Sequence, residues 1–208
     1  MLAKMTREAK YKRRNGTISR LEAEKRRGQI LDVALELFLR QGYDGTPARE
    51  IAEAAGTGKA NLYHHFPSKD ELLYALLAPL LDELESVLDN DSFSYGGVPE
   101  RAELLGHYLD ACLRHRGVAV FVSNNLILRA NPRVGPRISE IHARLLDRLC
   151  GKAAEINERV RAAGAVAVLH SAMLDFEERN TEKRDTDELR EAVLEAARIL
   201  LPCTESAS

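Results

Sequence analysis

The chain has 208 residues with a formal net charge of −2, and 45% of its residues are apolar while 30% are charged. This composition is typical of a soluble globular protein with one or two domains, and no apolar run approaches the ~18 residues of a transmembrane helix. The basic N-terminus lacks the apolar core of a secretory signal, and three scattered cysteines do not make a disulfide framework, so we expect a cytoplasmic protein.

Charge is unevenly distributed along the chain. Residues 1–27 contain ten Lys and Arg against three Asp and Glu, a net +7, which leaves −9 for the remainder. We expect residues 1–18 to form a flexible basic arm without helical periodicity, whose densest charge is Lys10, Lys12, Arg13 and Arg14. Such an arm can contact a polyanion and enter a DNA minor groove; the alternative is a disordered solubilising tail.

A first helix is expected to begin at Ser19, which forms a capping-box pattern with Glu22, and to end at Gly42. Its apolar stripe has helical spacing and consists of Ile30, Ala34, Leu37 and Phe38. Phe38 and Tyr43 could stack on a ligand, but we interpret them as core residues beneath the helices that follow.

Two short helices joined by a glycine-containing turn come next. Thr46 is expected to cap the first of them, with Pro47 at its first position and Gly56 at its end. The second runs from Lys59 to His65, before Pro67.

This layout is typical of a helix-turn-helix, whose second helix enters the major groove of DNA. That helix carries side chains able to bond phosphates or base edges, namely Lys59, Asn61, Tyr63, His64 and His65. An ordinary pair of helices in a bundle, with a solvated polar face, is the alternative.

Many residues of this segment fall at the fixed spacings of one family pattern. They are Ala34, Phe38, Gly42, Thr46, Ile51, Ala52, Ala55, Gly56, Leu62, Tyr63, Phe66, Lys69 and Leu72. Over its N-terminal third the chain therefore resembles the TetR family of transcriptional regulators. It departs from the pattern at Pro47 and Gly58, where a hydroxyl residue is usual, and at Ala60, where glycine is usual.

The resemblance implies an all-α fold of about nine helices. Residues 19–67 would form a three-helix DNA-binding head, residues 68–90 a connecting helix, and residues 98–208 an effector-binding and dimerisation domain. The family also implies a homodimer on a two-fold symmetric double-stranded operator, a small-molecule effector, and a cytoplasmic, nucleoid-associated location. By this resemblance Thr46, Tyr63, His64 and Lys69 would hold phosphates, while Lys59, Asn61 and Arg49 would reach bases; Gly58, Ala60 and His65 complete the predicted DNA surface.

The connecting helix is expected to begin with a second capping box, Ser68 to Glu71. Pro79 lies inside it, which predicts either a kink with mechanical consequences or simple curvature around the core. A loop over residues 89–98 then separates the two halves of the chain.

The remaining sequence is interpreted as wholly helical. A fifth helix starts at Pro99, and an apolar sixth covers residues 118–128 and should be buried on most sides. A seventh ends near Gly151, an eighth spans residues 155–178, and a ninth is capped at residues 185–188 and runs to Leu201.

Two sets of residues in this half are candidates for binding. A dimer seam is predicted along the last two helices, with intramolecular core as the alternative: Val166, Leu169, Met173, Phe176, Leu189, Val193, Ala196 and Leu200. Effector contacts are predicted at polar or bulky groups in apolar surroundings, with satisfied structural groups as the alternative: His107, Phe121, Asn124, Asn125, Arg129 and His142.

No catalytic or metal-binding motif is present, so we expect neither an enzyme nor a cofactor. His64 and His65 are adjacent, and neighbours on a helix point some 100° apart, which does not suit one metal ion. The hypothesis is a DNA-binding transcriptional regulator, a repressor released by a small molecule. Two alternatives are a DNA-binding factor without an effector, which a solid C-terminal core would favour, and a small-molecule enzyme or carrier with a vestigial head.

Overall fold

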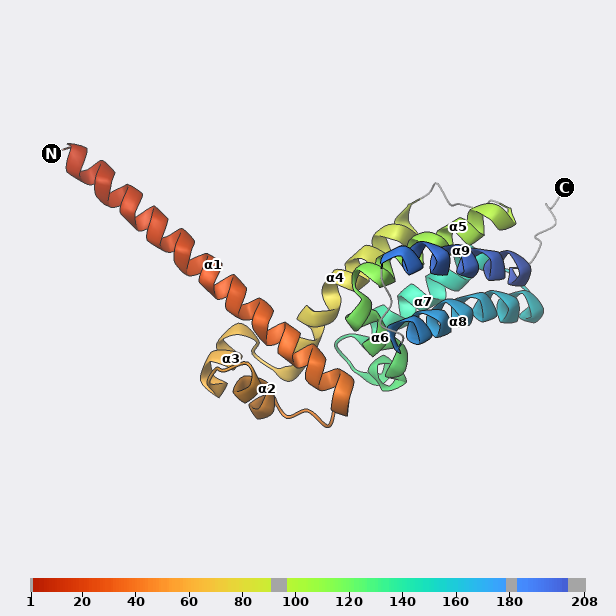
Figure 1. The fold of residues 1–208 in the computed structure, drawn as a ribbon, viewed down its shortest axis with the longest axis horizontal. Coiled ribbons are helices and arrows are strands. Elements are labelled where there is room, and N and C mark those ends of the chain that lie inside the picture. Colours follow the sequence, from red (N-terminus) through yellow and green to blue (C-terminus); the bar gives the residue numbers. More distant parts are fainter. Residues whose placement is uncertain (1, 91–96, 179–182, 202–208) are drawn as a thin grey trace. The chain divides into compact units, whose positions relative to one another are not determined.

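The computed structural model describes the backbone of residues 2–90, 97–178 and 183–201, and the side chains of residues 20–90, 97–174 and 186–201. Every regular element within these ranges is helical, which confirms the all-α prediction (Figure 1). The helices are α1 (Leu2–Gln41), α2 (Ala48–Ala54), α3 (Lys59–His65), α4 (Lys69–Asp89), α5 (Val98–Arg114), α6 (Arg116–Asn124), the 3-10 helix η2 (Leu126–Ala130), α7 (Gly135–Cys150), α8 (Ile156–Glu178) and α9 (Lys183–Leu200). They divide into a head, Met1–Leu72, and a body, Leu73–Ser208.

The first helix begins far earlier than the sequence pattern indicates. We predicted a start at Ser19 and no helical structure before it, and this is wrong, because α1 runs from Leu2 through the Asn15–Gly16 pair. Residues 2–14 are rich in Ala, Leu, Met, Lys, Arg and Glu, which favour a helix without needing an amphipathic stripe. The side chains of Lys10, Lys12, Arg13 and Arg14 lie outside the described residues.

The core of the head forms where α1 meets α2 and α3. Phe38 is 1% exposed and its ring lies edge-on to Tyr43, with 5.3 Å between centroids, which confirms that this pair belongs to the core. Ile51 and Phe66 are also buried, at most 2% exposed. Gly42 at φ +74° and Gly56 at φ +62° end α1 and the α2 segment, in backbone conformations that favour glycine.

Helix α4 starts with the predicted serine cap and is then buried along most of its length. The Glu71 backbone N–H donates to Ser68 Oγ at 3.0 Å. Eight leucines of this helix are at most 7% exposed, and the helix continues through Pro79 without interruption: Leu72, Leu73, Leu76, Leu77, Leu80, Leu81, Leu84 and Leu88. Because leucines face several directions, α4 is the central helix of the body core.

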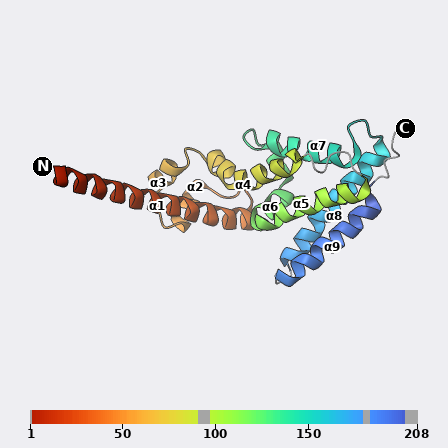
Figure 2. The ribbon, with the colours of Figure 1, turned by 90° about the horizontal axis from the view of Figure 1, so that it is seen from above.

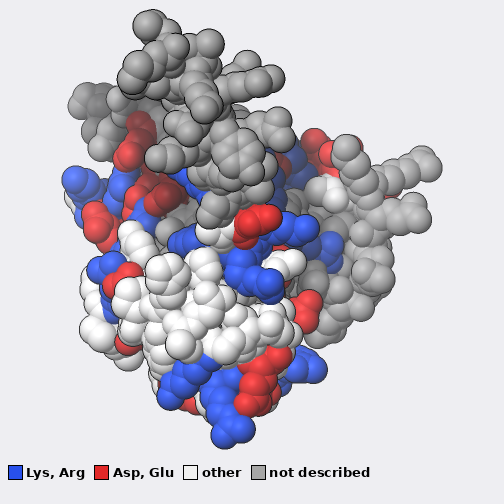
Figure 3. All heavy atoms as spheres, turned by 90° about the vertical axis from the view of Figure 1, so that its left-hand side faces the viewer, with Lys and Arg blue, Asp and Glu red and all other residues white. Residues whose placement is uncertain are grey.

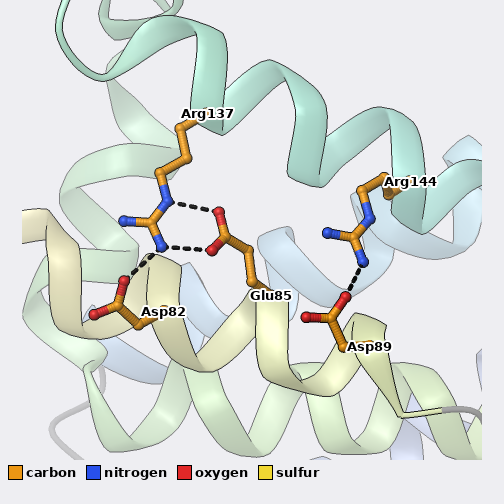
Figure 4. A network of polar contacts seen from close by, with 5 residues as sticks. All are labelled: Asp82, Glu85, Asp89, Arg137 and Arg144. Carbon is orange, nitrogen blue, oxygen red and sulfur yellow. Dashed lines mark hydrogen bonds and ion pairs between the residues drawn. The ribbon is translucent and has the colours of Figure 1, made fainter.

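Ionic contacts tie the remaining, polar side of α4 to α7 (Figure 4). Arg137 holds Glu85 through two hydrogen bonds of 2.6 Å and Asp82 through a third of 2.5 Å. Arg144 donates to Asp89 at 2.5 Å, one helical heptad further along. Arg148 then donates to the backbone carbonyls of Leu88 and Asn90, which otherwise lack helical partners at the end of α4. We call this row the α4–α7 arginine ladder.

The sixth helix is shorter than predicted. It ends at Asn124, where the Asn125 side-chain amide donates to the Phe121 carbonyl at 2.7 Å, and the chain continues as η2. The expectation of burial as far as Leu128 is wrong, since Leu126 is 73% and Ile127 61% exposed. The Asn125 side chain competes with the backbone for the Phe121 carbonyl, and the α-helix ends there. The spacing of apolar residues does not reveal such a competition.

Helices α8 and α9 lie side by side in both views (Figures 1 and 2). Arg161 of α8 donates to the carbonyls of Ile199, Leu200 and Leu201 at the end of α9, so the two helices are antiparallel. The ninth helix begins at Lys183, not at the cap predicted for residues 185–188.

Half of the predicted dimer seam is core within one chain. Val166, Leu169, Met173 and Val193 are at most 2% exposed, so their assignment to a dimer interface is wrong. These residues lie on the sides of α8 and α9 that pack within the body, and α5 contacts both helices. Leu189, Ala196 and Leu200 are half-buried, and the Phe176 side chain lies outside the described residues.

No helix in the described parts of the chain is both long enough and apolar enough to cross a lipid bilayer.

Gly135 allows the turn between η2 and α7 to close. A Cβ there would lie 2.2 Å from the Arg129 carbonyl oxygen, so we expect Gly135→Ala to lower the free energy of unfolding by about 1–3 kcal/mol, as overpacking does. Gly28→Ala, in open space within α1, is the control and should be neutral or slightly stabilising. Equal unfolding midpoints in urea for the two variants would contradict this account of the turn.

Candidate functional site

Helix α3 presents an exposed polar face while its apolar side is packed. Leu62 is 2% exposed and anchors the helix to the head core. Lys59, Asn61 and His64 are exposed, and Tyr63 is 39% exposed. The structure thus brings the predicted DNA-contacting side chains to the surface together.

Two interactions organise this face before any DNA is bound. The Asn61 amide donates to Thr57 Oγ1 at 2.7 Å, which holds the asparagine over the turn that precedes α3. The Lys59 ammonium lies 5.7 Å from the centroid of the Tyr63 ring, one helical turn away. Sequence reasoning missed Thr57, although its spacing of four residues from Asn61 was a signal.

The start of α3 is open to an approaching ligand. Gly58 is the N-cap residue, makes no side-chain cap hydrogen bond, and is exposed like Ala60. Arg49 on α2 is exposed as well, and its guanidinium donates to Glu53 at 2.6 Å. A surface ion pair of this kind is weak, so Arg49 can exchange Glu53 for another acceptor at little cost.

Two predicted phosphate contacts have structural roles instead. Thr46 is fully buried and its hydroxyl donates to the Gly42 carbonyl at 2.7 Å, so it neither caps α2 nor reaches the surface. Lys69 is half-buried, donates to the Tyr43 carbonyl, and lies over the Tyr43 ring, whose hydroxyl donates to Asp70. Burial lowers the Lys69 pKa and raises that of Tyr43. Both residues stabilise the arrangement of the helices, and Thr46 cannot reach DNA from its buried position.

His65 differs from its neighbour His64 in being half-buried. Burial lowers its pKa, and the nearby His64, Arg27 and Arg26 lower it further. A neutral His65 is thus favoured at the end of α3, with its ring near Phe66.

The described surface of the head is not strongly basic. Residues 20–72 contain eight Lys and Arg and nine Asp and Glu, a net charge of −1. In Figure 3, blue and red side chains alternate around an uncharged area. The excess of positive charge at the N-terminal end belongs to residues 1–19, with six basic residues and one acidic.

A second candidate site is a cavity inside the body. About 100 Å³ of it is accessible to the centre of a water molecule, and about 690 Å³ is unfilled by atoms when the mouth is included. Its apolar wall comes from α4, with Leu80, Leu81 and Leu84, and from α7, with Ile138 and Ile141. Exposed Leu126 lies at its rim on η2, so the space opens to the surface there.

The other wall of the cavity is polar. Of the predicted effector contacts, the structure places Asn125, Arg129 and His142 on it. The remaining lining groups with polar or sulfur atoms were missed by sequence reasoning, because they come from three separate helices: Tyr108, Cys112, Ser123 and His170.

Three predicted effector contacts do not line this cavity. Phe121 is 0% exposed and is packed in the core, and Asn124 is exposed on the far end of α6. His107 points to solvent beside Glu103, with 3.7 Å between His107 Nε2 and the carboxylate. Sequence alone could not separate the two sides of these helices.

The histidines, the tyrosine and the cysteine of the cavity are held neutral by their surroundings. Burial, together with the nearby His142 and the charge of Arg129, lowers the pKa of His170 to about 4. Burial and Arg129 also lower the His142 pKa. Burial raises the pKa of Tyr108, and raises that of the Cys112 thiol to about 12. No group of three or more potential metal ligands occurs among the described residues.

Comparisons with known proteins agree with the geometry of the head. Residues 30–76 match the family model for bacterial regulatory proteins of the tetR family. Over 59 residues the chain is 44% identical to the HTH-type transcriptional repressor KstR2 of Rhodococcus jostii, a match that covers 28% of this chain and 29% of that protein. Over 68 residues it is 46% identical to the HTH-type transcriptional activator FasR of Mycolicibacterium smegmatis, covering 33% and 31%. The chain thus spans less than a third of the length of either regulator.

Structural similarity extends over both units. A solved member of the TetR transcriptional regulator family from Streptomyces coelicolor A3 has a TM-score of 0.64 and 25% identity, covering 83% of this chain and 90% of its own. All three of these similar proteins are named as regulators of transcription.

The half-buried His170 should make stability depend on pH. Its folded pKa is about 4 against 6.5 in the unfolded chain, so the unfolded state binds the extra proton between these values and stability falls as pH drops below 6.5. Between pH 7.5 and 5.5 the wild-type chain should lose about 1–1.5 kcal/mol more unfolding free energy than His170→Gln. Urea unfolding at both pH values measures this difference, and parallel losses in the two proteins would show that His170 does not titrate as described.

Proposed function

The chain belongs to the tetR family of bacterial regulatory proteins, and from this membership we propose that it is a sequence-specific DNA-binding transcriptional regulator, a repressor that a small molecule releases from its operator. The observation that carries the proposal is the exposed polar face of α3 on a family-matched helix-turn-helix. Repression follows the KstR2 resemblance, whereas FasR is named an activator.

Different residues of the exposed face of α3 would contact bases and phosphates. Asn61 suits the paired donor and acceptor of adenine, and Lys59 suits the acceptors of guanine. Tyr63 and His64 can bond phosphates and set the register of the helix. Because Thr57 already positions the Asn61 amide, little side-chain entropy is lost when Asn61 meets a base.

A homodimer would present two such helices to a two-fold symmetric operator, with half-sites about one helical turn apart. The exposed outer side of α8 and α9 supports this proposal better than the stripe predicted from the sequence. Ile156 is 78% exposed, Val160 64% and Ile199 72%, and the small residues Ala167 and Ala192 continue the same faces. An exposed apolar surface of this kind suits a contact between two copies of the chain, which predicts twice the 23.2 kDa chain mass in solution.

The cavity supports control by a small molecule. Leu80, Leu81 and Leu84 line it from α4, and the first turn of the same helix belongs to the head. A ligand that fits one arrangement of α4 better than another would shift the population of dimers whose heads match the operator spacing. A solid body core, which would favour a DNA-binding factor without an effector, is not what the described residues form.

Asn61→Ala should relax sequence preference at one operator position by about 1–3 kcal/mol, because the paired hydrogen bonds to a base edge are removed. Tyr63→Phe is the matched variant, and should weaken binding about equally on all sequences because it removes a hydrogen bond to a phosphate. Selection of bound DNA from a random pool, at two salt concentrations, measures both.

A two-fold symmetric motif in that selection supports the dimer. An unchanged motif with Asn61→Ala would refute the placement of α3. Motif-free binding that disappears at higher salt would indicate phosphate contact alone, and would favour a carrier or enzyme with a vestigial head.

The basic N-terminal part of α1, which we call the basic arm, should supply most of the salt dependence of binding, since residues 20–72 have a net charge of −1. We expect Arg13→Gln with Arg14→Gln to reduce the slope of log affinity against log salt by about 0.9 for each phosphate that the arm no longer neutralises. The control pair Lys152→Gln with Arg133→Gln, in the body, should leave the slope unchanged. If both pairs behave like the wild-type chain, the arm does not contact DNA.

A further inference from the structure

The charges on the polar wall of the body cavity indicate which chemical class of ligand the cavity can bind. We propose that this cavity binds an organic anion: a carboxylate, or an acid group of equal charge, attached to an apolar body. The inference rests on the proposed function only in taking the cavity as the effector site.

The first observation is the sign of the charge. The lining includes the cation Arg129 and the two histidines His142 and His170, and no Asp or Glu among the described residues. A cationic ligand would therefore meet only repulsion or neutral groups at this wall, and an anion would meet attraction.

The second observation is that Arg129 lacks a counter-ion in the described part of the chain. Five other arginines of the body bind carboxylates, and Arg148 and Arg161 bind backbone carbonyls: the five are Arg114, Arg137, Arg144, Arg159 and Arg190. The guanidinium of Arg129 has no ion pair or hydrogen bond to any described residue, although it lines a cavity. Its five donors are available to a bound acid group, which guanidinium recognises in a bidentate manner.

The acidic side chains of α4 that neighbour the cavity leucines are already engaged, since Arg137 binds Asp82 and Glu85. Glu83 lies next to the cavity leucine Leu84, but its carboxylate binds Arg114 and accepts or shares a hydrogen bond of 2.8 Å with His115. These two bonds lower the Glu83 pKa and hold the carboxylate at the α5–α6 junction. It is therefore not available to neutralise Arg129.

The third observation is the convergence of uncharged donors on the same space. Tyr108 comes from α5, His142 from α7 and His170 from α8, and all three line the cavity. The charge of Arg129 acts on each of them, which places the four groups around one space. A neutral histidine and a protonated tyrosine each offer one N–H or O–H donor. An acid group can accept from these donors as well as from Arg129.

The apolar wall defines the rest of the ligand. Leucines of α4 and isoleucines of α7 face the polar groups across the cavity, and burying an apolar body there gains the hydrophobic free energy of transfer. A small inorganic anion would leave this wall uncovered, and a polyol would leave its hydroxyls unpaired against leucine. An acid with an alkyl or aryl body satisfies both walls.

The test is isothermal titration of the full chain, without DNA, at pH 7.5 and constant ionic strength. The probes are straight-chain carboxylates of six to twelve carbons and phenylalkanoates, each beside the alcohol and the ammonium compound of equal length. We expect at least one carboxylate to bind, its alcohol to bind at least tenfold more weakly, and its ammonium analogue not to bind. Acetate, which has no apolar body, should not bind either.

Arg129→Gln should weaken the bound carboxylate by about tenfold and leave the weak binding of the alcohol unchanged. Arg133→Gln is the matched control, since Arg133 lies four residues further on, over the Tyr74 ring and outside the cavity lining. Binding of the alcohol or ammonium compound as tightly as the carboxylate overturns the proposal. So does the absence of binding by every carboxylate, or equal affinities for the wild-type chain and Arg129→Gln.

Failure of the proposed function gives a different result. If the bound carboxylate leaves operator affinity unchanged, the cavity binds organic anions but does not control DNA binding. If a neutral compound releases the operator while no carboxylate binds, the effector role stands and the ligand class assigned here is wrong.

Discussion

Burial of α4 is the constraint on which the rest of the structure depends. Its leucines face the core in several directions, while Asp82, Glu85 and Asp89 are held by the α4–α7 arginine ladder. The partly exposed ion pairs of such a ladder are individually weak, and they add to a register that the close packing of the buried leucines already favours. The helix that is fixed in this way also begins in the head and lines the cavity, so one element takes part in both candidate sites.

The polar groups of the two candidate sites differ in exposure and in charge. On α3 the groups are exposed, and the Asn61 amide is held over the preceding turn by Thr57, so these groups can meet DNA without a change in the core. In the cavity, burial keeps His142 and His170 neutral while Arg129 has no counter-ion in the described residues. The first arrangement suits reversible reading of a hydrated polyanion, and the second suits selection of a small ligand by charge and shape.

Local patterns in the sequence determined the helical class, the bounds of α3, the serine cap of α4 and the glycines that end α1 and the α2 segment. They also identified the exposed residues of α3, because amphipathic spacing within one helix states which side is buried. In residues 2–18 α1 forms without an apolar stripe, because the composition of this segment favours a helix. Apolar periodicity alone therefore does not predict where α1 begins.

Only the tertiary structure decided which groups from different helices meet. Thr46 and Lys69 match a DNA-contact pattern by position, yet burial and bonds to Gly42 and Tyr43 make them structural. The stripe of Leu169 and Met173 packs within one chain, and Tyr108 and His170 join Arg129 around a cavity that no spacing encodes. Sequence periodicity reports the sides of a single helix, whereas a pocket or an interface depends on the rotation and distance between helices, and these follow from packing of the whole core.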